Sequence, residues 1–443
     1  FATWLIDENE ADACLISFFA DNYDDWRFSL VSVNYDRELS SKGKIKVKKI
    51  ISPVKRYSYL VGKNEPNHTA KSQLAPLLYS DNEVNIEILE KAFSIEKITK
   101  EFFEQYKRLC FKIVDELKLL RKKDKNIDND FKKHYLKEED FAKKFMGQIV
   151  FLYFVQKKGW IGIQREKNGF FTKWGSGPKN FLRKLFNKEY CNYKNFFNDV
   201  LEDLFYIGLS VDLPDNYYSK LKCKVPFLNG GLFEPINDYN WKETDITIDN
   251  NTIKEILDVF DTFNFTINEE ESLEKEIAID PETLGKVFEN LLDENLQRGQ
   301  GVFYTPRNIV NYMCELAIAS FLKNNLNQNY TYFDYKKYIS EIVLGDLETI
   351  NSLEKLSKDT YIFFKKNLEI IDNLLKNIRI CDPAVGSGAF PVSMMNIVVK
   401  IRKTLKLYHK QSNENINYKL KYNFIKKNIY GVDIDKAAVE IAK

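Results

Sequence analysis

Polar and apolar residues alternate in three segments near the N-terminus, and this pattern predicts short strands. The segments are 27–35 (RFSLVSVNY), 42–52 (KGKIKVKKIIS) and 56–61 (RYSYLV). Successive side chains of a strand point to opposite faces, so alternation suits a sheet with one buried face. The link between the first two segments carries Ser40, Ser41 and Gly43, which predicts a hairpin. We expect residues 1–92 to form a small mixed α/β region.

Apolar residues recur at three- and four-residue steps further along, and this spacing predicts amphipathic helices. One covers 94–120 with Ser94 as its N-cap, and a second covers 138–158 and ends at Gly159. Between them, 121–130 (RKKDKNIDND) is expected to be a charged linker. The stretch 227–235 (FLNGGLFEP) predicts a loop, because Asn-Gly-Gly does not suit a regular element. We expect a helical domain over 93–270.

The pattern changes near residue 270 to strand, glycine turn and helix. A helix is expected over 279–290, with Asp280 as its N-cap and Pro281 at its first position. The stretch 323–375, rich in Lys, Asn, Tyr and Leu, is expected to add further helices. We therefore expect a third region over 271–443.

Composition limits the class of protein. The 443 residues include 66 Lys and Arg, yet the net charge is only +2, and a near-neutral total can hide a basic face. Six cysteines and three histidines lie far apart, which argues against a zinc site or disulfides and favours a reducing cytoplasm. No apolar run is long enough to predict a membrane span. The chain begins without Met and ends inside a helical pattern, so we expect a fragment of a longer protein.

A short strand ending at Cys381 leads into a glycine-rich turn, DPAVGSGAF (382–390), and then a helix. Glycines permit a tight turn and close approach of a ligand to the backbone, as at dinucleotide sites. The spacing is neither GxGxxG nor GxxxxGK[ST]. An acidic residue at the strand end, Asp382, would repel a pyrophosphate and attract a cation. A sulfonium ligand with an ammonium group fits that charge.

Two further segments carry compatible chemistry. In 429–442 (IYGVDIDKAAVEIA), Asp433 ends a second predicted strand, where an acidic side chain can accept both ribose hydroxyls, and Asp435 is expected to cap the next helix. In 299–311 (GQGVFYTPRNIVN), Thr305 and Pro306 predict a helix start whose amide groups suit a carboxylate. The apolar face of that helix is expected to contain Ile309, Val310, Met313 and Leu316.

In chain order, VFYTP (302–306), DPAVGSGAF (382–390) and GVDID (431–435) resemble motifs X, I and II of the amino-group DNA methyltransferases. The N6-adenine enzymes of the gamma order are the most similar, as in type I modification subunits and type IIG (Eco57I-like) restriction–modification proteins. Segments 141–160, 227–234 and 281–290 also resemble the helical region before the methylase core of type IIG-like proteins. The resemblance covers about 95–443.

This resemblance implies a Rossmann-like methyltransferase core in 271–443, of which these residues form the N-terminal half. It implies S-adenosyl-L-methionine as cofactor and double-stranded DNA as partner, with restriction or defence-system subunits as further candidates and no membrane. Phe303 and Thr305 would hold the methionine end of the cofactor. Asp382 would lie near its ammonium group, with Ala384 beside it.

The same resemblance assigns Gly386 and Gly388 to the loop that passes under the cofactor, and Asp433 to its ribose. In this family the target adenine is flipped out of the duplex, and an N-P-P-[YF] motif holds its amino group. That motif does not occur in this sequence, so the fragment is expected to bind cofactor weakly and not to methylate. The stretches from Thr305 to Asp382 and from Asp382 to Asp433 are also unusually long.

Type IIG proteins usually carry an N-terminal nuclease with an Asp and an E-x-K sequence around Mg²⁺. The E-x-K here, at 116–118, falls inside the first long predicted helix. Asp24, Asp25, Asp36 and Glu38 lie beside predicted strands without a suitably spaced lysine, so we interpret them as surface acids. Basic residues between 55 and 71 alternate with Tyr57 and Tyr59, a pattern that could follow a nucleic-acid backbone but more often is a polar loop.

The leading hypothesis is part of a site-specific, adenine-N6 DNA methyltransferase in a restriction–modification or phage-defence protein, which in its full length could also carry a restriction endonuclease. The alternative is a non-catalytic DNA-binding or scaffold portion of such a complex. A third reading is a methyltransferase acting on RNA or protein, because motifs X, I and II report the cofactor rather than the substrate.

Overall fold

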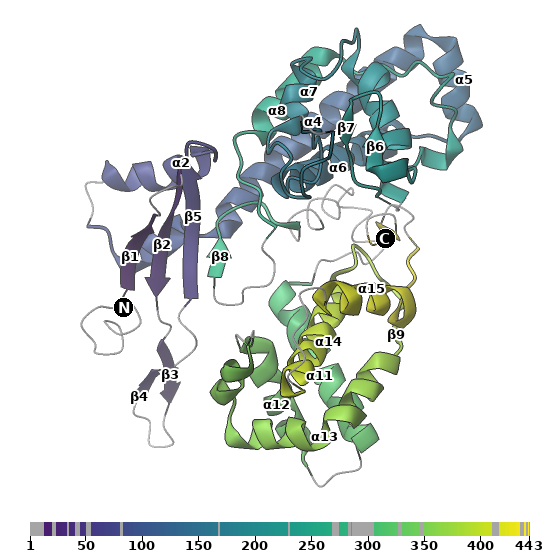
Figure 1. Ribbon diagram of the computed structural model, residues 1–443. Coiled ribbons are helices and arrows are strands. Elements are labelled where there is room, and N and C mark those ends of the chain that lie inside the picture. The colour runs from purple at the N-terminus through teal and green to yellow at the C-terminus, as the bar shows by residue number, and fades with distance from the viewer. Residues whose placement is uncertain are drawn as a thin grey trace. The chain divides into compact units, whose positions relative to one another are not determined.

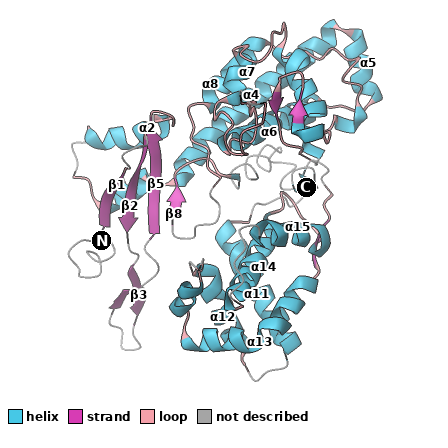
Figure 2. Ribbon diagram, viewed as in Figure 1, coloured by secondary structure: helices cyan, strands magenta, loops and turns pink. Residues whose placement is uncertain are grey.

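The computed structural model describes most of the chain in two units, Phe1–Val287 and Phe288–Lys443 (Figure 1). The described residues are 13–19, 24–32, 35–39, 45–49, 55–79, 83–166, 169–228, 231–267, 274–281, 285, 305–326, 330–345, 347, 349–409, 416–434, 438, 439 and 442. Strands are concentrated at the start of the first unit, and helices make up most of the rest (Figure 2).

A mixed sheet opens the first unit. It consists of β1 (Ala13–Phe18), β2 (Asp25–Ser32), β5 (Lys55–Gly62) and β8 (Glu274–Glu276), in that order. The pairs β1–β2 and β2–β5 are antiparallel, and β5–β8 is parallel. Helices α2 (His68–Leu78) and α3 (Ile86–Ala92) follow β5. The described residues between 13 and 92 thus include strands, as the alternation predicts, and two helices.

The predicted hairpin forms with a different first strand. The segment 27–35 divides into β2, which ends at Ser32, and β3 (Tyr35–Leu39). β3 pairs antiparallel with β4 (Ile45–Lys49), whereas β2 pairs with β5 along its full length. The turn residues Ser40, Ser41 and Gly43 lie outside the described residues.

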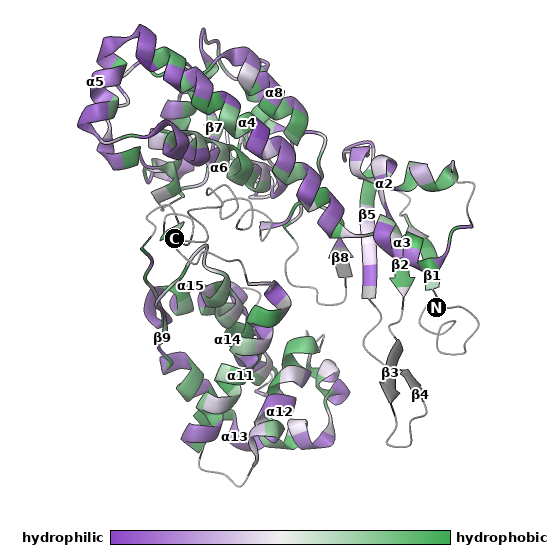
Figure 3. Cartoon of the chain, turned by 180° about the vertical axis from the view of Figure 1, so that it is seen from behind, coloured by the Kyte–Doolittle hydropathy of each residue, from purple (hydrophilic) through white to green (hydrophobic). Residues whose placement is uncertain are grey.

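The helical part of the first unit is built around two long helices. α4 (Ile95–Lys123) is capped by the Ser94 hydroxyl, and α6 (Glu138–Lys157) is followed by Gly159 in the left-handed region at φ 67°, as the sequence predicts. This part of the unit also contains helices α7 (Phe181–Phe186) and α8 (Asn250–Phe260), two π-helical turns over Phe197–Leu201 and Leu204–Leu209, and two short strands, β6 (Tyr217–Tyr218) and β7 (Cys223–Lys224). Figure 3 shows hydrophobic and hydrophilic residues interspersed along these helices, as expected of helices with one buried face.

The expected charged linker at 121–130 is wrong. α4 continues to Lys123, and a further helix, α5 (Lys125–Lys133), begins at once. Asp124 ends the first helix and caps the second, because its carboxylate accepts hydrogen bonds from the amides of Asn126 and Ile127. Ile127 and Phe131, one turn apart, are buried and hold α5 against the core. The burial of these two apolar residues and the Asp124 cap thus stabilise a helix, although most residues of the segment are charged or polar.

The second unit is mainly helical. It contains α11 (Arg307–Leu326), α12 (Tyr332–Leu344), α13 (Lys358–Asn377), α14 (Ala389–Tyr408) and α15 (Ile416–Asn428). Strands β9 (Ile380–Asp382) and β10 (Ile429–Gly431) form a parallel pair. The extra helices expected within 323–375 are confirmed as α12 and most of α13, and both pack into one core with α11 and α14.

The two units meet in sequence at residues 287 and 288, downstream of the expected boundary near 270, and β8 at 274–276 belongs to the first sheet. The helix expected over 279–290 lies mostly outside the described residues. Among the described helices, none combines the length and the apolar character needed to cross a membrane.

Candidate functional site

The two strands of the second unit end beside each other, and their ends carry the predicted acidic residues. β9 and β10 are parallel, with Gly431 opposite Asp382. The backbone N–H of Val432 donates to the carbonyl of Asp382 at 2.9 Å, and the N–H of Val385 donates to the carbonyl of Val432 at 2.9 Å. These bonds fasten the turn after β9 to the segment after β10. The carboxyl ends of parallel strands meet at one sheet edge, where ligands bind in open α/β folds.

Asp433 is in direct contact with the glycine-rich turn. Its Oδ2 accepts a hydrogen bond of 2.8 Å from the backbone N–H of Gly386, which lies at φ 51°. Gly388 lies at φ 90° and caps α14. Both angles are in the left-handed region, which glycine adopts without a Cβ penalty. The turn therefore brings the Gly386 amide up to an acidic side chain, and the Gly388 amide donates to the Val385 carbonyl at 2.9 Å.

Asp382 has one satisfied and one unsatisfied carboxylate oxygen. Its Oδ1 accepts from the backbone N–H of Ala384 at 3.0 Å. Its Oδ2 is buried and, within the part of the chain that the structure describes, has no hydrogen-bond partner. A buried carboxylate oxygen without a partner is costly, and an ammonium donor would satisfy it. The position is thus suited to a cationic group.

The segment around Thr305 reaches this site through helix packing. Thr305 and Pro306 precede α11, and the carbonyl of Pro306 accepts from the amide of Val310 at 3.0 Å. Asn311 of α11 accepts a 2.6 Å hydrogen bond from the Ser393 hydroxyl of α14, the helix that follows the glycine turn. Thr305 is half-buried at the start of α11, whereas Phe303 lies outside the described residues.

The apolar face expected on this helix is partly wrong. Val310 is buried, but Ile309 and Met313 are about half exposed. The buried face instead runs through Cys314, Ile318, Ala319 and Leu322. Burial raises the pKa of the Cys314 thiol, so this cysteine behaves as a core residue. The contact between α12 and α11, which sequence spacing does not reveal, decides which face is covered.

Other predicted features of the site have mixed outcomes. Asp435 lies outside the described residues. Gly431, not singled out in the sequence, lies against Val385, and a Cβ at this position would come within 2.8 Å of Val385 Cγ2. The Asn311–Ser393 contact was also missed, although Asn311 is the last residue of the predicted motif segment.

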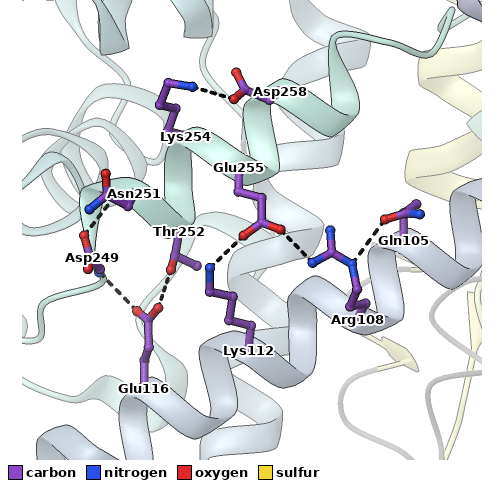
Figure 4. Close-up of polar contacts among 10 residues, drawn as sticks. All are labelled: Gln105, Arg108, Lys112, Glu116, Asp249, Asn251, Thr252, Lys254, Glu255 and Asp258. Carbon is purple, nitrogen blue, oxygen red and sulfur yellow. Dashed lines mark hydrogen bonds and ion pairs between the residues drawn. The ribbon is translucent and has the colours of Figure 1, made fainter.

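The E-x-K sequence has a structural role. Glu116 lies in α4, and its two carboxylate oxygens accept from the backbone N–H of Asp249, at 3.1 Å, and from the Thr252 hydroxyl (Figure 4). Both donors belong to the N-terminal turn of α8, which favours a negative charge. Lys118 pairs with Glu139 at 3.2 Å. Among the described residues, no group of three or more His, Cys, Asp or Glu is placed to hold a metal ion.

The basic and aromatic residues near β5 are engaged in local contacts. Tyr59 is buried and donates to the carbonyl of Ala92. His68 lies 3.4 Å from Glu101, and Lys63 lies 3.8 Å from Asp24. The polar loop expected after the strand is limited to 63–67, because 55–62 form β5 and α2 begins at His68.

No protein-family model matches the chain. Over 382 residues, 79% of this chain, it is 32% identical to a Methanocaldococcus jannaschii protein provisionally named as a type II restriction enzyme and methyltransferase, and the match covers 29% of that protein. Among solved structures, that of the Type IIL restriction–modification enzyme MmeI in complex with DNA is similar with a TM-score of 0.40 and 15% identity, covering 77% of this chain and 35% of MmeI. The chain thus spans less than a third of its curated relative. Over most of its length, the chain is related to part of a protein named for both restriction and methyltransferase functions.

Proposed function

We propose that these residues form the cofactor-binding part of a site-specific DNA methyltransferase that modifies adenine at N6, in a gamma-order, Eco57I-like type IIG restriction–modification protein. The observation that carries the proposal is the meeting of Asp382, the glycine turn and Asp433 at the ends of two parallel strands. The relative's name supports a restriction–modification role, and the choice of adenine rests on the motif resemblance.

The residues fit S-adenosyl-L-methionine. Its ammonium group would satisfy the buried Oδ2 of Asp382, which lacks a hydrogen-bond partner among the described residues. The amide-rich turn from Ala384 to Gly388 would follow the methionine portion closely, because neither glycine presents a Cβ. Asp433, at the end of the second strand, would accept the ribose hydroxyls.

The start of α11 completes the proposed pocket. Phe303 and Thr305 would hold the methionine end of the cofactor, and the Asn311–Ser393 hydrogen bond fixes α11 against the helix that follows the glycine turn. In this proposal, β9, α14 and β10 belong to a partial Rossmann-like methyltransferase core. The bound cofactor supplies an electrophilic methyl group, and this chain's own residues bind and orient it. We assign no described residue to the flipped base, because the N-P-P-[YF] sequence does not occur here.

Methyl transfer tests the proposal. The purified protein in its full natural length is incubated with duplex DNA and methyl-labelled S-adenosylmethionine, and the DNA is digested to nucleosides. The proposal expects label in N6-methyladenine, with loss of that label in Asp382→Ala and retention in a surface control, Asp359→Ala. Label in cytosine, in RNA or in protein would contradict the adenine assignment.

A further inference from the structure

Positive charge is concentrated in one segment of the helical part of the first unit. Residues 157–194 contain ten Lys and Arg and two Glu, a net charge of +8 (ten minus two) in a chain whose total is +2. Three of these basic residues form ion pairs within the fold, and one of them, Lys184, lies 3.7 Å from Glu189. Lys157 pairs with Glu65 at 2.5 Å, and Arg183 pairs with Asp258 and Asp261, each at 2.8 Å.

Short backbone pairings gather several of the remaining cations. Ile163 and Lys224 form an antiparallel bridge, Arg165 and Phe171 form another, and Tyr217 pairs with Lys224 in the β6–β7 ladder. These pairings bring Arg165 beside Lys224, which lies 59 residues further along the chain. The sequence alone gives no sign of this meeting.

Aromatic rings, rather than carboxylates, hold these cations in place. The Arg165 guanidinium lies 4.5 Å from the Tyr217 ring centre and 4.9 Å from that of Phe171. The Lys224 ammonium lies 4.3 Å from the Trp174 ring centre. Lys158 lies over Trp160 at 4.6 Å. Across the described ranges, none of the three cations forms an ion pair with a carboxylate, so the contact that orders each of them is with a ring.

A pocket of about 330 Å³ opens beside this group. Arg165 and Lys184 line it with the hydroxyls of Thr172 and Ser176, which lie 2.5 Å apart. Glu166 also lines it, so its wall is not uniformly positive. Cations and hydroxyl donors around one hollow are the groups that bind a phosphate in nucleic-acid complexes.

Exposed rings border the cations. The exposed fractions are 40% for Trp160, 42% for Trp174 and 75% for Phe170. Large apolar side chains that remain exposed next to ordered cations suit a partner with both charged and apolar surface. A sugar–phosphate backbone has this combination, with phosphates for the cations and deoxyribose and bases for the rings.

Lys173, next to Trp174 in the sequence, is exposed as well. We propose that Lys158, Arg165, Lys173 and Lys224, with Trp160 and Trp174, form a cation–aromatic strip that contacts the backbone of duplex DNA. The inference rests on the proposed function for its choice of DNA. It adds a DNA contact in the helical domain, independent of base recognition. Because phosphate contacts carry no sequence information, the strip contributes affinity and positioning.

The test measures the salt dependence of DNA binding. Fluorescence anisotropy follows a labelled duplex of arbitrary sequence titrated with the protein between about 50 and 200 mM NaCl, a range over which phosphate contacts dominate the change. The strip variant carries Arg165→Gln, Lys173→Gln and Lys224→Gln. The matched control carries Lys97→Gln, Lys100→Gln and Lys107→Gln on the exposed side of α4, which removes the same charge from the same unit. Tryptophan fluorescence during thermal unfolding checks that both variants fold.

In the strip variant, the plot of log K against log salt concentration is expected to be less steep than in wild type. The magnitude of its slope should fall by about 2 to 3, because each phosphate contact that is removed contributes about 0.9. The control is expected to keep the wild-type slope. A folded strip variant with the wild-type slope, or a control that loses as much, would overturn the proposal. Cofactor binding, measured on the same samples, separates the two proposals. If the wild-type protein does not bind S-adenosylmethionine, the proposed function is contradicted. The comparison of the salt dependence of DNA binding between the strip variant and the control still tests the strip.

Discussion

The carboxylate of Asp433 accepts a hydrogen bond from the backbone N–H of Gly386 at 2.8 Å, across 47 residues of sequence. This contact lies where the parallel strands β9 and β10 end. It places Gly386 and Asp433, which belong to different motifs, in one site. It also means that Asp433 has a structural role before any ligand arrives. Its proposed contact with a ribose adds to that role.

Asp433→Ala is therefore expected to weaken S-adenosylmethionine binding by about 10- to 100-fold, because hydrogen bonds to a charged acceptor contribute about 1.5–3 kcal/mol. Asp433→Asn keeps a side-chain acceptor for the Gly386 amide and is expected to lose less affinity for the cofactor than Asp433→Ala. Equilibrium dialysis with labelled cofactor measures both. Equal affinity of Asp433→Ala and wild type would contradict a role for this residue at the ribose.

Gly388 offers a test of the turn. At φ 90°, a side chain with a Cβ is strained, and a Cβ would lie 3.5 Å from Ala442. Gly388→Ala is expected to destabilise the second unit by about 1–2 kcal/mol, and Gly388→Asn by less, because Asn tolerates the left-handed region better. All five Trp residues precede residue 288, so tryptophan fluorescence follows the first unit alone.

The lower stability of Gly388→Ala should consequently appear in urea unfolding followed by far-UV circular dichroism. It should be absent from the unfolding transition followed by tryptophan fluorescence. A matched control is Gly169→Ala, which has a similar φ of 83° but no neighbour within 4 Å and lies in the first unit. Its effect should appear in fluorescence. Gly388→Ala unfolding at the wild-type urea concentration by circular dichroism would count against the strained turn.

Glu116 distinguishes a structural acid from a nuclease residue. Glu116→Ala leaves the backbone N–H of Asp249, the N-cap of α8, and the Thr252 hydroxyl without their acceptor, so it is expected to destabilise the first unit by about 1–3 kcal/mol. Lys118→Ala breaks only an exposed ion pair and is expected to cost less than about 1 kcal/mol. Fluorescence-monitored urea unfolding compares them. A stable Glu116→Ala protein that has lost DNA cleavage would reverse this interpretation.

Glu202 predicts a pH dependence of stability. It is fully buried, and its carboxyl group accepts a 2.8 Å hydrogen bond from the Tyr239 hydroxyl. Burial raises the pKa of Glu202 from 4.5 to about 9. The folded state therefore holds a proton that the unfolded state releases above pH 4.5, so this contribution to stability falls as pH rises toward 9, by up to about 1.4 kcal/mol per pH unit.

Glu202→Gln removes that titration while keeping a neutral side chain of the same size. The variant is expected to show a flatter dependence of unfolding free energy on pH between about 5 and 9 than wild type. Urea unfolding followed by tryptophan fluorescence at several pH values measures it. Parallel curves for the two proteins would show that Glu202 is ionised in the folded state.

Sequence patterns predicted the elements with strong periodicity and missed those that depend on distant partners. The spacing of apolar residues and the Ser94 cap were sufficient for α4. The prediction of a linker at 121–130 was wrong, because the Asp124 cap and two buried apolar residues stabilise a helix in this charged segment. β8 has three residues, with Glu274 and Glu276 at its ends, and exists because β5 offers a free edge. No local pattern encodes that edge.

The same distinction applies to the candidate site. The positions of Asp382 and Asp433 at strand ends followed from strand, turn and helix patterns along the chain. The direct bond from Gly386 to Asp433 and the unpartnered oxygen of Asp382 depend on how β9 and β10 align, which sequence spacing does not fix. The approach of Arg165 to Lys224 depends likewise on a backbone bridge between distant segments.

The central claim is that Asp382 receives the ammonium group of S-adenosylmethionine, and isothermal titration calorimetry of the cofactor into the protein in its full natural length tests it most directly. Asp382→Asn keeps the size of the side chain and removes its charge, and Asp359→Asn makes the same change at an exposed position in the first turn of α13. We predict measurable binding by wild type and Asp359→Asn, and affinity at least about 10-fold lower, equivalent to 1.4 kcal/mol, for Asp382→Asn. Wild-type affinity in Asp382→Asn, or no binding by wild type, would contradict the claim.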